Sequence, residues 1–332
     1  MRTLRWGLVG ASDIAATRII PAMRRLGHQI VGVSSGSDER AAEYAQLHQI
    51  PYFTSQIGVL VSRDDIDAVY VSTVNRLHHP DTLSAAAAGK HVLCEKPIAL
   101  DAGEARHLLQ VQARTGVKIG EAFMVRTHPQ WLRTRELIRA GRIGELRSVM
   151  GFFSYFNPDP ANIRNVRAWG GGGLMDIGCY PINTSRFIFG EEPRRATALL
   201  ERDPEMQVDR LTSAMLDFPS GQSVFTCGTQ LTYYQRMQFF GTQGRIEIEI
   251  PFNAPPDRPC RIFIDDGSDL FGAGIQTEML PVCDQYTIQG DLFSQAVRGE
   301  GEVPVPLEDA IRNMAVIDAL IRSAESGRWE TP

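Results

Sequence analysis

The first 124 residues alternate between two hydrophobic periodicities. Short apolar runs bounded by turn residues are followed by longer stretches in which apolar positions recur every three to four residues. This alternation is typical of a parallel sheet whose strands are joined by helices. The predicted strands are Arg5–Val9, Ile30–Ser34, Ala68–Ser72, His91–Cys94 and Lys118–Phe123. The predicted helices are Ile14–Leu26, Glu39–Leu47, Pro80–Ala88 and Ala102–Thr115.

The pattern changes after residue 124. A helix near Gln130–Arg139 and a strand at Leu146–Phe153 precede an irregular segment, Asn157–Asn165, and a glycine run that opens another helical stretch. From Arg195 onward strands dominate, which indicates a mainly antiparallel sheet with one face covered by helices and the other either solvated or packed on a second subunit. The strands predicted there are Ala196–Glu201, Leu211–Phe218, Gln222–Thr229, Met237–Phe240 and Arg245–Ile250.

These patterns predict an α/β chain with two domains. Residues 1–124 are expected to form a doubly wound, Rossmann-type parallel sheet, and residues 125–332 an α/β domain with a large, mainly antiparallel open sheet. The last amphipathic stretch, Leu307–Ala324, is a candidate to pack back on the first domain. With 332 residues, 43% of them hydrophobic, the chain is long enough for two separate cores.

Charge and cysteine content narrow the classes of function. The formal net charge is -5, so there is no basic surplus to bind nucleic acid or an anionic membrane. The N-terminus leads directly into an apolar strand without a signal-type stretch, and no run is long enough to span a membrane, so a cytoplasmic enzyme is expected. The five cysteines are scattered without metal or redox spacing and are expected to be reduced thiols.

A glycine-containing turn ends the first predicted strand. The segment Gly7-Leu8-Val9-Gly10-Ala11-Ser12-Asp13-Ile14-Ala15 passes from strand to helix, where backbone N–H groups at a helix start can bind a pyrophosphate. Gly10 and Ala15 occupy the first and third small positions of the dinucleotide fingerprint, and Ser12 replaces the middle glycine. The alternative is an ordinary tight turn without a ligand. The strand–helix alternation that follows this segment favours the dinucleotide site over that alternative.

The second strand bears on the choice between NADP and NAD. An acidic residue at its end normally binds the ribose of NAD, whereas a basic residue nearby suits the 2′-phosphate of NADP. Here the strand is followed by Ser35 and Ser37, with Arg40 on the next helix, which favours NADP over NAD. Asp38 and Glu39 oppose that preference unless they point away, and Arg40 is also consistent with an ordinary solvated helix residue.

Three further motifs follow in order along the chain. Ser72-Thr73-Val74-Asn75-Arg76-Leu77-His78 ends one predicted strand, and Cys94-Glu95-Lys96-Pro97 ends the next. Gly170-Gly171-Gly172-Gly173-Leu174-Met175-Asp176-Ile177-Gly178-Cys179-Tyr180 lies in the second domain. Ligands of open α/β sheets bind beyond the carboxyl ends of the strands, so the first two motifs are expected near a cofactor.

Taken together, these motifs resemble the glucose–fructose oxidoreductase/inositol dehydrogenase (Gfo/Idh/MocA) family over nearly the whole chain. The first half is most similar to anhydrofructose reductases, and the second half to glucose–fructose oxidoreductase, dihydrodiol dehydrogenase and xylose dehydrogenase, through Glu121–Arg126 and Tyr180. Many relatives have histidine in place of Tyr180. The resemblance implies a Rossmann domain, a second domain whose open sheet forms a homodimer or homotetramer, and a cis bond before Pro97. The expected cofactor contacts are Gly10, Ala11, Ser12, Asp13, Ile14, Ser35, Ser37, Arg40, Thr73, Asn75, His78, Glu95, Lys96 and Pro97.

The chemistry of hydride transfer connects Lys96, Tyr180 and Asp176. When hydride moves between a nicotinamide and a carbinol carbon, a proton must leave or reach the oxygen. A tyrosine is a poor base by itself, but a neighbouring ammonium favours its phenolate. Asp176 lies one helical turn before Tyr180 and is expected to orient the substrate or Lys96, although Gly178 and Pro181 weaken the helix between them. A packing role for Tyr180 and a helix-start role for Asp176 are the alternatives.

The remaining candidates are less specific. Adjacent His78 and His79 do not share a helix face, so no metal site is expected. Arg126 is interpreted either as a substrate contact or as an ion-pair partner at the domain junction, and Trp169 either as a wall of the sugar pocket or as a core residue. Glu95 is expected to hold Lys96 or the nicotinamide ribose.

The sequence therefore predicts an NADP-dependent oxidoreductase acting on a CH–OH or C=O group of a sugar, anhydro-sugar or polyol. A trans-dihydrodiol or aldose 1-dehydrogenase using the same residues is one alternative. A cofactor-binding sensor without catalysis is another, which retention of both Lys96 and Tyr180 opposes. An enzyme that cycles a tightly held cofactor between two sugars is a third.

Overall fold

The computed structural model describes residues 2–332 and divides into two compact units. The first contains the chain up to Met124 together with Tyr286–Ile311, and the second contains Val125–Gln285 together with Arg312–Pro332. No helix within residues 2–332 combines the length and the apolar character needed to cross a bilayer.

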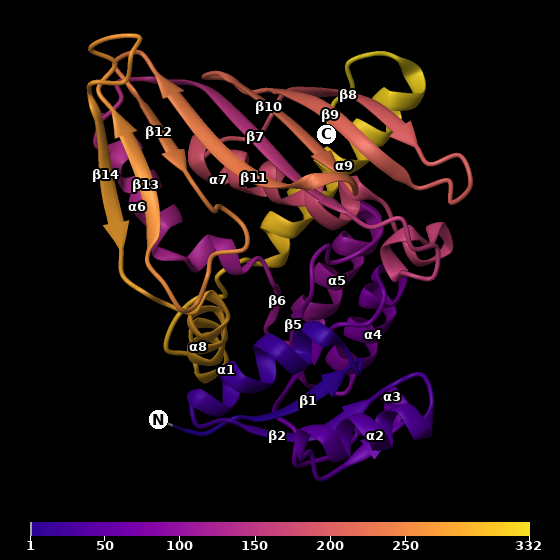
Figure 1. The fold of residues 1–332 in the computed structure, drawn as a ribbon. Coiled ribbons are helices and arrows are strands. Elements are labelled where there is room, and N and C mark those ends of the chain that lie inside the picture. Colours follow the sequence, from indigo (N-terminus) through magenta and orange to yellow (C-terminus); the bar gives the residue numbers. More distant parts are fainter. Residues whose placement is uncertain (1) are drawn as a thin grey trace. The chain divides into compact units, whose positions relative to one another are not determined.

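The first unit is built on a six-stranded parallel sheet (Figure 1). Its strand order, β3-β2-β1-β4-β5-β6, is that of the Rossmann fold and confirms the predicted architecture. The strands are β1 (Arg5–Val9), β2 (Gln29–Ser34), β3 (Phe53–Thr54), β4 (Ala68–Val71), β5 (His91–Cys94) and β6 (Ile119–Glu121). The helices are η1 (Ala15–Ile19), α1 (Ile20–Arg25), α2 (Asp38–His48), α3 (Ile57–Val61), α4 (Asn75–Ala87) and α5 (Ala102–Thr115).

Two features of this unit differ from the sequence prediction. Helix α4 begins at Asn75 and contains Pro80 in its interior, whereas the prediction began the helix at Pro80. Proline removes one backbone donor but does not prevent the helix when the surrounding turns are otherwise formed. The short elements β3 and α3 were not predicted, because two and five residues are too few to show a hydrophobic period.

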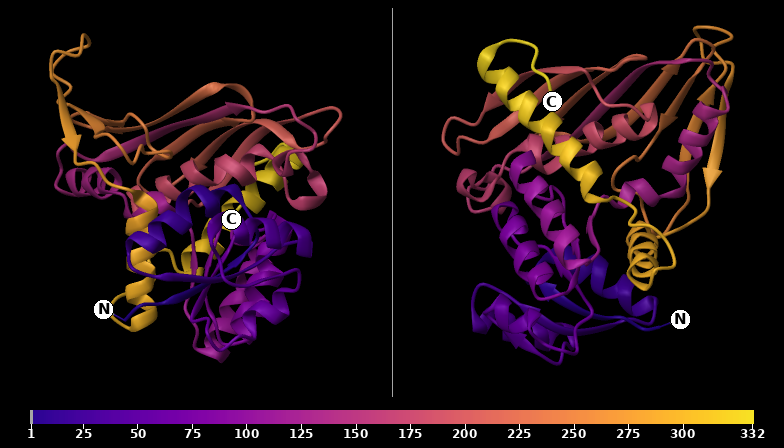
Figure 2. Two further views of the ribbon diagram at one scale, coloured as in Figure 1. Left: turned by 60° about the horizontal axis from the view of Figure 1, so that its bottom comes forward. Right: turned by 180° about the vertical axis from the view of Figure 1, so that it is seen from behind.

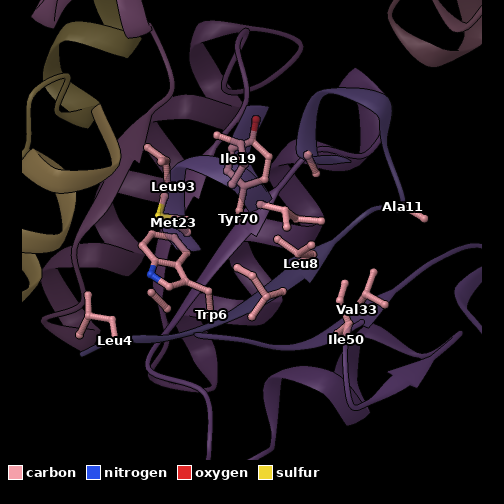
Figure 3. Packing of buried hydrophobic residues seen from close by; sticks show 14 of the residues in the cluster. Leu4, Trp6, Leu8, Ala11, Ile19, Met23, Val33, Ile50, Tyr70 and Leu93 are labelled. Atoms are coloured by element: carbon pink, nitrogen blue, oxygen red, sulfur yellow. The ribbon is translucent and has the colours of Figure 1, made fainter. Parts of the chain in front are cut away.

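The core of the first unit packs one face of β1 against the helices around it (Figure 3). Trp6, Leu8, Met23 and Tyr70 are among its fully buried side chains. Helix α8 (Gln285–Arg298) completes this core, since the ring of Phe293 lies 5.8 Å from that of Trp6. The segment that returns to the first unit therefore begins at Tyr286, before the predicted stretch Leu307–Ala324. That stretch forms α9 (Leu307–Ser326), which lies mostly in the second unit.

The second unit contains an eight-stranded sheet in the order β14-β13-β12-β11-β7-β10-β9-β8. All neighbouring strands are antiparallel except β7 and β10, so the mainly antiparallel sheet is confirmed. Strands β13 and β14 lie beyond the last predicted strand. The strands are β7 (Leu146–Phe156), β8 (Arg195–Arg202), β9 (Asp209–Asp217), β10 (Gln222–Gly228), β11 (Gln230–Gly241), β12 (Arg245–Ile248), β13 (Cys260–Asp265) and β14 (Ile275–Leu280).

Helices cover one face of this sheet and leave the other open (Figure 2). On the covered face, Ser185 of α7 (Cys179–Phe189) bonds to Ser223 of β10 with 2.8 Å between their oxygens, and Ser323 of α9 accepts the N–H of Ala198. The remaining elements of the unit are η2 (Met124–Thr127), α6 (Pro129–Arg139), η3 (Ile163–Asn165), η4 (Arg167–Trp169) and η5 (Leu174–Gly178). The open face carries exposed apolar side chains, among them Met150 and Leu199.

Candidate active site

The turn after β1 brings the backbone close to the end of β4. Gly10 has a φ of +108°, and a Cβ on it would lie 2.9 Å from the carbonyl carbon of Ser72. Its N–H donates to the Ser34 carbonyl at 2.9 Å, which fixes the turn to the end of β2 as well. Only glycine fits this conformation and this space without strain. The turn has the close backbone approach that a pyrophosphate site requires.

Ser12 connects this turn to the neighbouring strand. Its Oγ lies 2.7 Å from Oγ of Ser72 and accepts the N–H of Ala15 at 3.2 Å. The hydroxyl of Ser12, an expected cofactor contact, therefore also caps the following helix. Ala15 is completely buried, consistent with the close packing expected of the third small position.

Arg40 folds back over the same turn. Its Nη2 donates to the Ala11 carbonyl at 2.9 Å, and Tyr44 donates to the Ser12 carbonyl at 2.9 Å. The backbone N–H of Arg40 is capped by Ser37 Oγ. Asp38 accepts the N–H of Ser55 at 2.7 Å, so one of the two opposing carboxylates is held by the loop after β3. A guanidinium is thus placed beside the nucleotide turn.

His78 connects the ends of β4 and β5. It is buried, and its Nδ1 and Nε2 lie 2.7 Å and 3.0 Å from the carbonyl oxygens of Pro97 and Thr73. Burial lowers the pKa of His78, and a neutral imidazole donates to only one of these carbonyls. Thr73, just before α4, donates to Asp81 within that helix at 2.7 Å, and Asn75 is the first residue of the helix. The Thr73–His78 motif therefore holds the backbone around Lys96.

Lys96 precedes a cis proline, as the family resemblance implied. Glu95 accepts the Lys96 N–H at 3.2 Å and also a short hydrogen bond from the hydroxyl of Tyr70. Glu121 accepts the N–H of Ile98 at 2.8 Å. Two carboxylates, Glu95 just after β5 and Glu121 on β6, thus fix the segment that carries Lys96 at the carboxyl edge of the sheet.

Tyr180 belongs to the second unit, in a helical run that continues through the glycine and proline expected to weaken it. The π-helical turn η5 leads directly into α7, with Pro181 in its first turn. Tyr180 is only 6% exposed, and its ring lies 5.8 Å from that of Phe153 and 5.3 Å from that of Phe252. Both Asp176 and Tyr180 are therefore on helical backbone, and a π-helical turn at this place is common at functional sites.

Asp176 receives two hydrogen bonds that sequence reasoning did not predict. Its Oδ2 accepts the hydroxyl of Tyr155 at 2.7 Å and Nε of Arg164 at 3.1 Å. Burial and the negative charge of Asp176 raise the pKa of Tyr155, so that this hydroxyl remains a donor. The orientation of Asp176 is thus set by side chains of its own unit.

The glycine run before Asp176 surrounds a buried carboxylate. Gly172 has a φ of +130°, and a Cβ on it would overlap Oδ1 of Asp209. Oδ2 of Asp209 accepts the N–H of Leu174 at 2.6 Å and the hydroxyl of Thr212 at 3.0 Å. Burial raises the pKa of Asp209 to about 6. Asp209 therefore fixes the start of the helical run that carries Asp176 and Tyr180.

Two weaker candidates are now placed within the second unit. Arg126 donates to Asn183 at 3.2 Å and lies over the ring of Phe187, at 4.4 Å from its centroid. Trp169 is half-buried in η4, so it is not a core tryptophan. In the first unit, His79 contacts His107 at 3.0 Å. Within residues 2–332, no cluster of three or more His, Cys, Asp or Glu side chains is arranged to hold a metal ion.

Comparison with family models covers more than half of the chain. Residues 4–123 match an oxidoreductase family described by its NAD-binding Rossmann fold, and residues 131–247 match the GFO/IDH/MocA C-terminal domain. The chain belongs to the Gfo/Idh/MocA family. The resemblance inferred from Lys96, Tyr180 and their motifs is thereby confirmed, and the chain is an NAD(P)-dependent oxidoreductase.

Relatives match this Gfo/Idh/MocA chain over nearly its full length. An uncharacterised oxidoreductase of Rhizobium meliloti is 40% identical over 100% of both chains. A D-xylose 1-dehydrogenase (NADP+) of Haloferax volcanii is 33% identical over 98% of each chain. The crystal structure of a 3-ketoreductase from Actinomadura kijaniata, in complex with NADP and TDP-benzene, has a TM-score of 0.90 and 28% identity, covering 97% of this chain and 98% of that one.

Three residues near the family motifs were missed by sequence reasoning. Arg164 lies in a segment without periodicity, and Asp209 precedes the predicted strand Leu211–Phe218. Tyr155 lies two residues beyond the predicted end of its strand. Alternation along β7 places it on the same face as Phe153, so a longer strand prediction would have found it.

Proposed function

We propose that this chain is an NADP-dependent oxidoreductase that transfers a hydride between the nicotinamide and a CH–OH or C=O group of a sugar, anhydro-sugar or polyol. In this proposal Tyr180 is the acid/base, Lys96 is its electrostatic partner and Asp176 orients the reacting group. The observation that carries the proposal is that the nucleotide turn after β1 and Lys96 after β5 lie at the carboxyl edge of one parallel sheet.

The residues of the first unit fit a dinucleotide. The Gly10 turn leaves room for a pyrophosphate against the start of the following helix, where backbone N–H groups favour an anion. Arg40, held by the Ala11 carbonyl, supplies a cation for a 2′-phosphate, and Asp38 is bonded to the Ser55 loop. The D-xylose dehydrogenase relative is named for NADP, and the 3-ketoreductase was crystallised with it, which supports NADP for this chain.

The bound nicotinamide supplies the hydride, and the protein has to manage the accompanying proton. Tyr180 gives its hydroxyl proton to the reacting oxygen during reduction, or takes one from it during oxidation. The Lys96 ammonium favours the phenolate form of Tyr180 and hydrogen-bonds the same oxygen. Phe153 and Phe252, which pack on the Tyr180 ring, exclude water from one side of it.

Activity measurements with a Lys96→Ala variant test this function. NADPH absorbance is followed with keto-sugars, osones and anhydro-sugars, and NADP reduction with aldoses and inositols. We expect at least one compound to react, and the variant to lose about 100-fold in kcat, because it removes the cation beside the proton carrier. The control is Lys118→Ala, which removes a partly exposed lysine directly before the first residue of β6. Absence of reaction with every compound, or full activity of Lys96→Ala, would sink the proposal.

Cofactor choice is tested separately at Arg40. Arg40→Ala should raise the Kd for NADPH about tenfold or more, because a charge-assisted bond to the 2′-phosphate is lost, and leave the Kd for NADH nearly unchanged. Arg114→Ala, which removes an exposed arginine from the last turn of α5, is the matched control. Both constants are measured by quenching of protein fluorescence. An unchanged NADPH-to-NADH ratio would remove Arg40 from the NADP site.

The second unit supports self-association as part of the proposal. The open face of its sheet carries an apolar groove of about 440 Å³ between β7, β8, β9 and β10, whose lining includes Met150, Phe152, Leu199 and Val224. Contiguous exposed apolar surface on a sheet marks a protein interface. We propose that a second copy of the chain covers this face, in a homodimer or homotetramer.

The cytoplasmic localisation expected from the sequence stays a prediction.

A further inference from the structure

We propose that Arg164 and Tyr155 are positioning residues of this active site. They hold the Asp176 carboxylate in one orientation and in its ionised form. Arg164 also supplies a positive charge that offsets the effect of the negative Asp176 on the Tyr180 hydroxyl. This inference rests on the proposed roles of Tyr180 and Asp176.

Both donors converge on one carboxylate oxygen from different elements. The Tyr155 hydroxyl, on the covered face of β7, donates to Asp176 Oδ2 at 2.7 Å, and Arg164 Nε, from η3, donates to the same atom at 3.1 Å. The Asp176 side chain is only 11% exposed, so these bonds are weakly screened by water. A carboxylate held by one neutral and one charged donor cannot rotate without breaking both.

The backbone of Arg164 is fastened to the glycine run. Its carbonyl accepts the N–H of Gly172 at 2.8 Å, and its own N–H donates to Asn162 Oδ1 at 3.1 Å. Asn165 holds the preceding loop by donating to the carbonyls of Asn157 and Asp159 at 3.0 Å and 2.8 Å. The irregular segment and the glycine run, which seemed unrelated in the sequence, thus form one support that aims Arg164 at Asp176.

Charge balance gives this contact a chemical consequence. The ionisable groups that act on Asp176, Tyr155, Arg164 or Asp209 include Tyr180 (α7), Cys227 (β10) and Arg202 (β8). Arg164 is the cation that bonds to Asp176 directly, in addition to Lys96, the proposed partner of Tyr180. A negative Asp176 beside Tyr180 disfavours a phenolate, and a positive Arg164 favours it. The negative charge of Asp176 in turn raises the pKa of Arg164, so the guanidinium stays charged near neutral pH.

Direct contact with substrate is a second role open to the Arg164 guanidinium, and the test must distinguish it from the positioning of Asp176. The Arg164 side chain is 45% exposed, and its hydrogen bond to Asp176 uses Nε. Direct contact with substrate would appear mainly in KM, whereas positioning of Asp176 and stabilisation of the Tyr180 phenolate would appear in kcat and in its pH dependence.

The experiment compares Arg164→Met, Arg164→Lys and Tyr155→Phe in the full chain, with Arg167→Met, an exposed arginine of η4, as the control. We expect Arg164→Met to lower kcat about tenfold and to move the pH limb that belongs to Tyr180 upward by about one unit. Arg164→Lys should restore most of that shift because it keeps the charge. Tyr155→Phe should lower kcat severalfold without moving the limb, because it removes no charge.

A second measurement needs no substrate. Tyrosine ionisation is followed by ultraviolet absorbance, and the transition that disappears in Tyr180→Phe is assigned to Tyr180. That transition should move upward by about one pH unit in Arg164→Met and much less in Arg164→Lys. An unshifted transition, or an effect of Arg164→Met on KM alone, would overturn the inference. Full activity of Tyr180→Phe would instead overturn the proposed function on which it rests.

Discussion

Replacement of Tyr180 by phenylalanine is expected to lower kcat by about 100-fold to 10,000-fold, the usual contribution of a positioned acid or base. The variant removes one hydroxyl and keeps the ring, so the contacts with Phe153 and Phe252 remain. Stability and the Kd for NADPH should therefore be close to those of the unmodified chain. Steady-state kinetics with the best substrate, together with NADPH fluorescence titration, measures these quantities.

A matched control makes this result specific. Tyr233→Phe makes the same chemical change at a tyrosine of β11 that is 78% exposed. It should leave kcat within about twofold of the unmodified enzyme, as exposed substitutions usually do. If Tyr180→Phe behaves like Tyr233→Phe, Tyr180 is a packing residue and the proton carrier lies elsewhere. If it loses kcat only together with its thermal stability, the loss reports a damaged fold.

Replacement of Gly172 by alanine is expected to cost about 3 kcal/mol or more of stability. A φ of +130° is unfavourable for a residue with a Cβ, which contributes about 1–3 kcal/mol. The new methyl group would also displace the Asp209 carboxylate, whose bond to the Leu174 N–H is worth about 1.5–3 kcal/mol. Urea unfolding followed by fluorescence should show a lower midpoint, and kcat should fall because Asp176 and Tyr180 lie on the helical run that begins here.

The control for this prediction is Gly301→Ala, at a glycine without a positive φ and with no atom within 4 Å of an added Cβ. It should leave the unfolding midpoint and kcat unchanged or slightly raise the midpoint, because alanine restricts the unfolded chain. Equal midpoints for Gly172→Ala and Gly301→Ala would show that the loop relaxes around the methyl group. The glycine run would then have no strict role in placing Asp176.

The hydrogen bonds around Asp176 change the role expected for residues of the second unit. Sequence motifs place Asp176 and Tyr180 four residues apart and suggest that they act directly on substrate or Lys96. The structure shows a carboxylate that is already held by Tyr155 and Arg164, on a helix whose start is held by Asp209. The proposed chemistry therefore depends on residues outside the family motifs.

The architecture and the motif residues follow from local patterns in the sequence. Hydrophobic patterns with a period of two or 3.6 residues are local properties of the chain. The strands β1 and β5 and the helix α5 therefore have the bounds that the sequence predicted. The nucleotide turn was recognisable because glycine at Gly10 meets a local backbone requirement. Lys96 and Tyr180 were found through motifs of consecutive residues, which a single chain displays directly.

Contacts between side chains that are distant in the sequence became visible only in the folded chain. Arg164 in η3 and Asp209 at the start of β9 lie 12 and 35 residues away from their partners Asp176 and Leu174, and both fall outside the predicted strands and helices. Helix α8 and the edge strands β13 and β14 likewise depend on long-range packing, which overrides weak local signals. A hydrogen bond between distant residues depends on the path of the whole backbone, and no local pattern records that path.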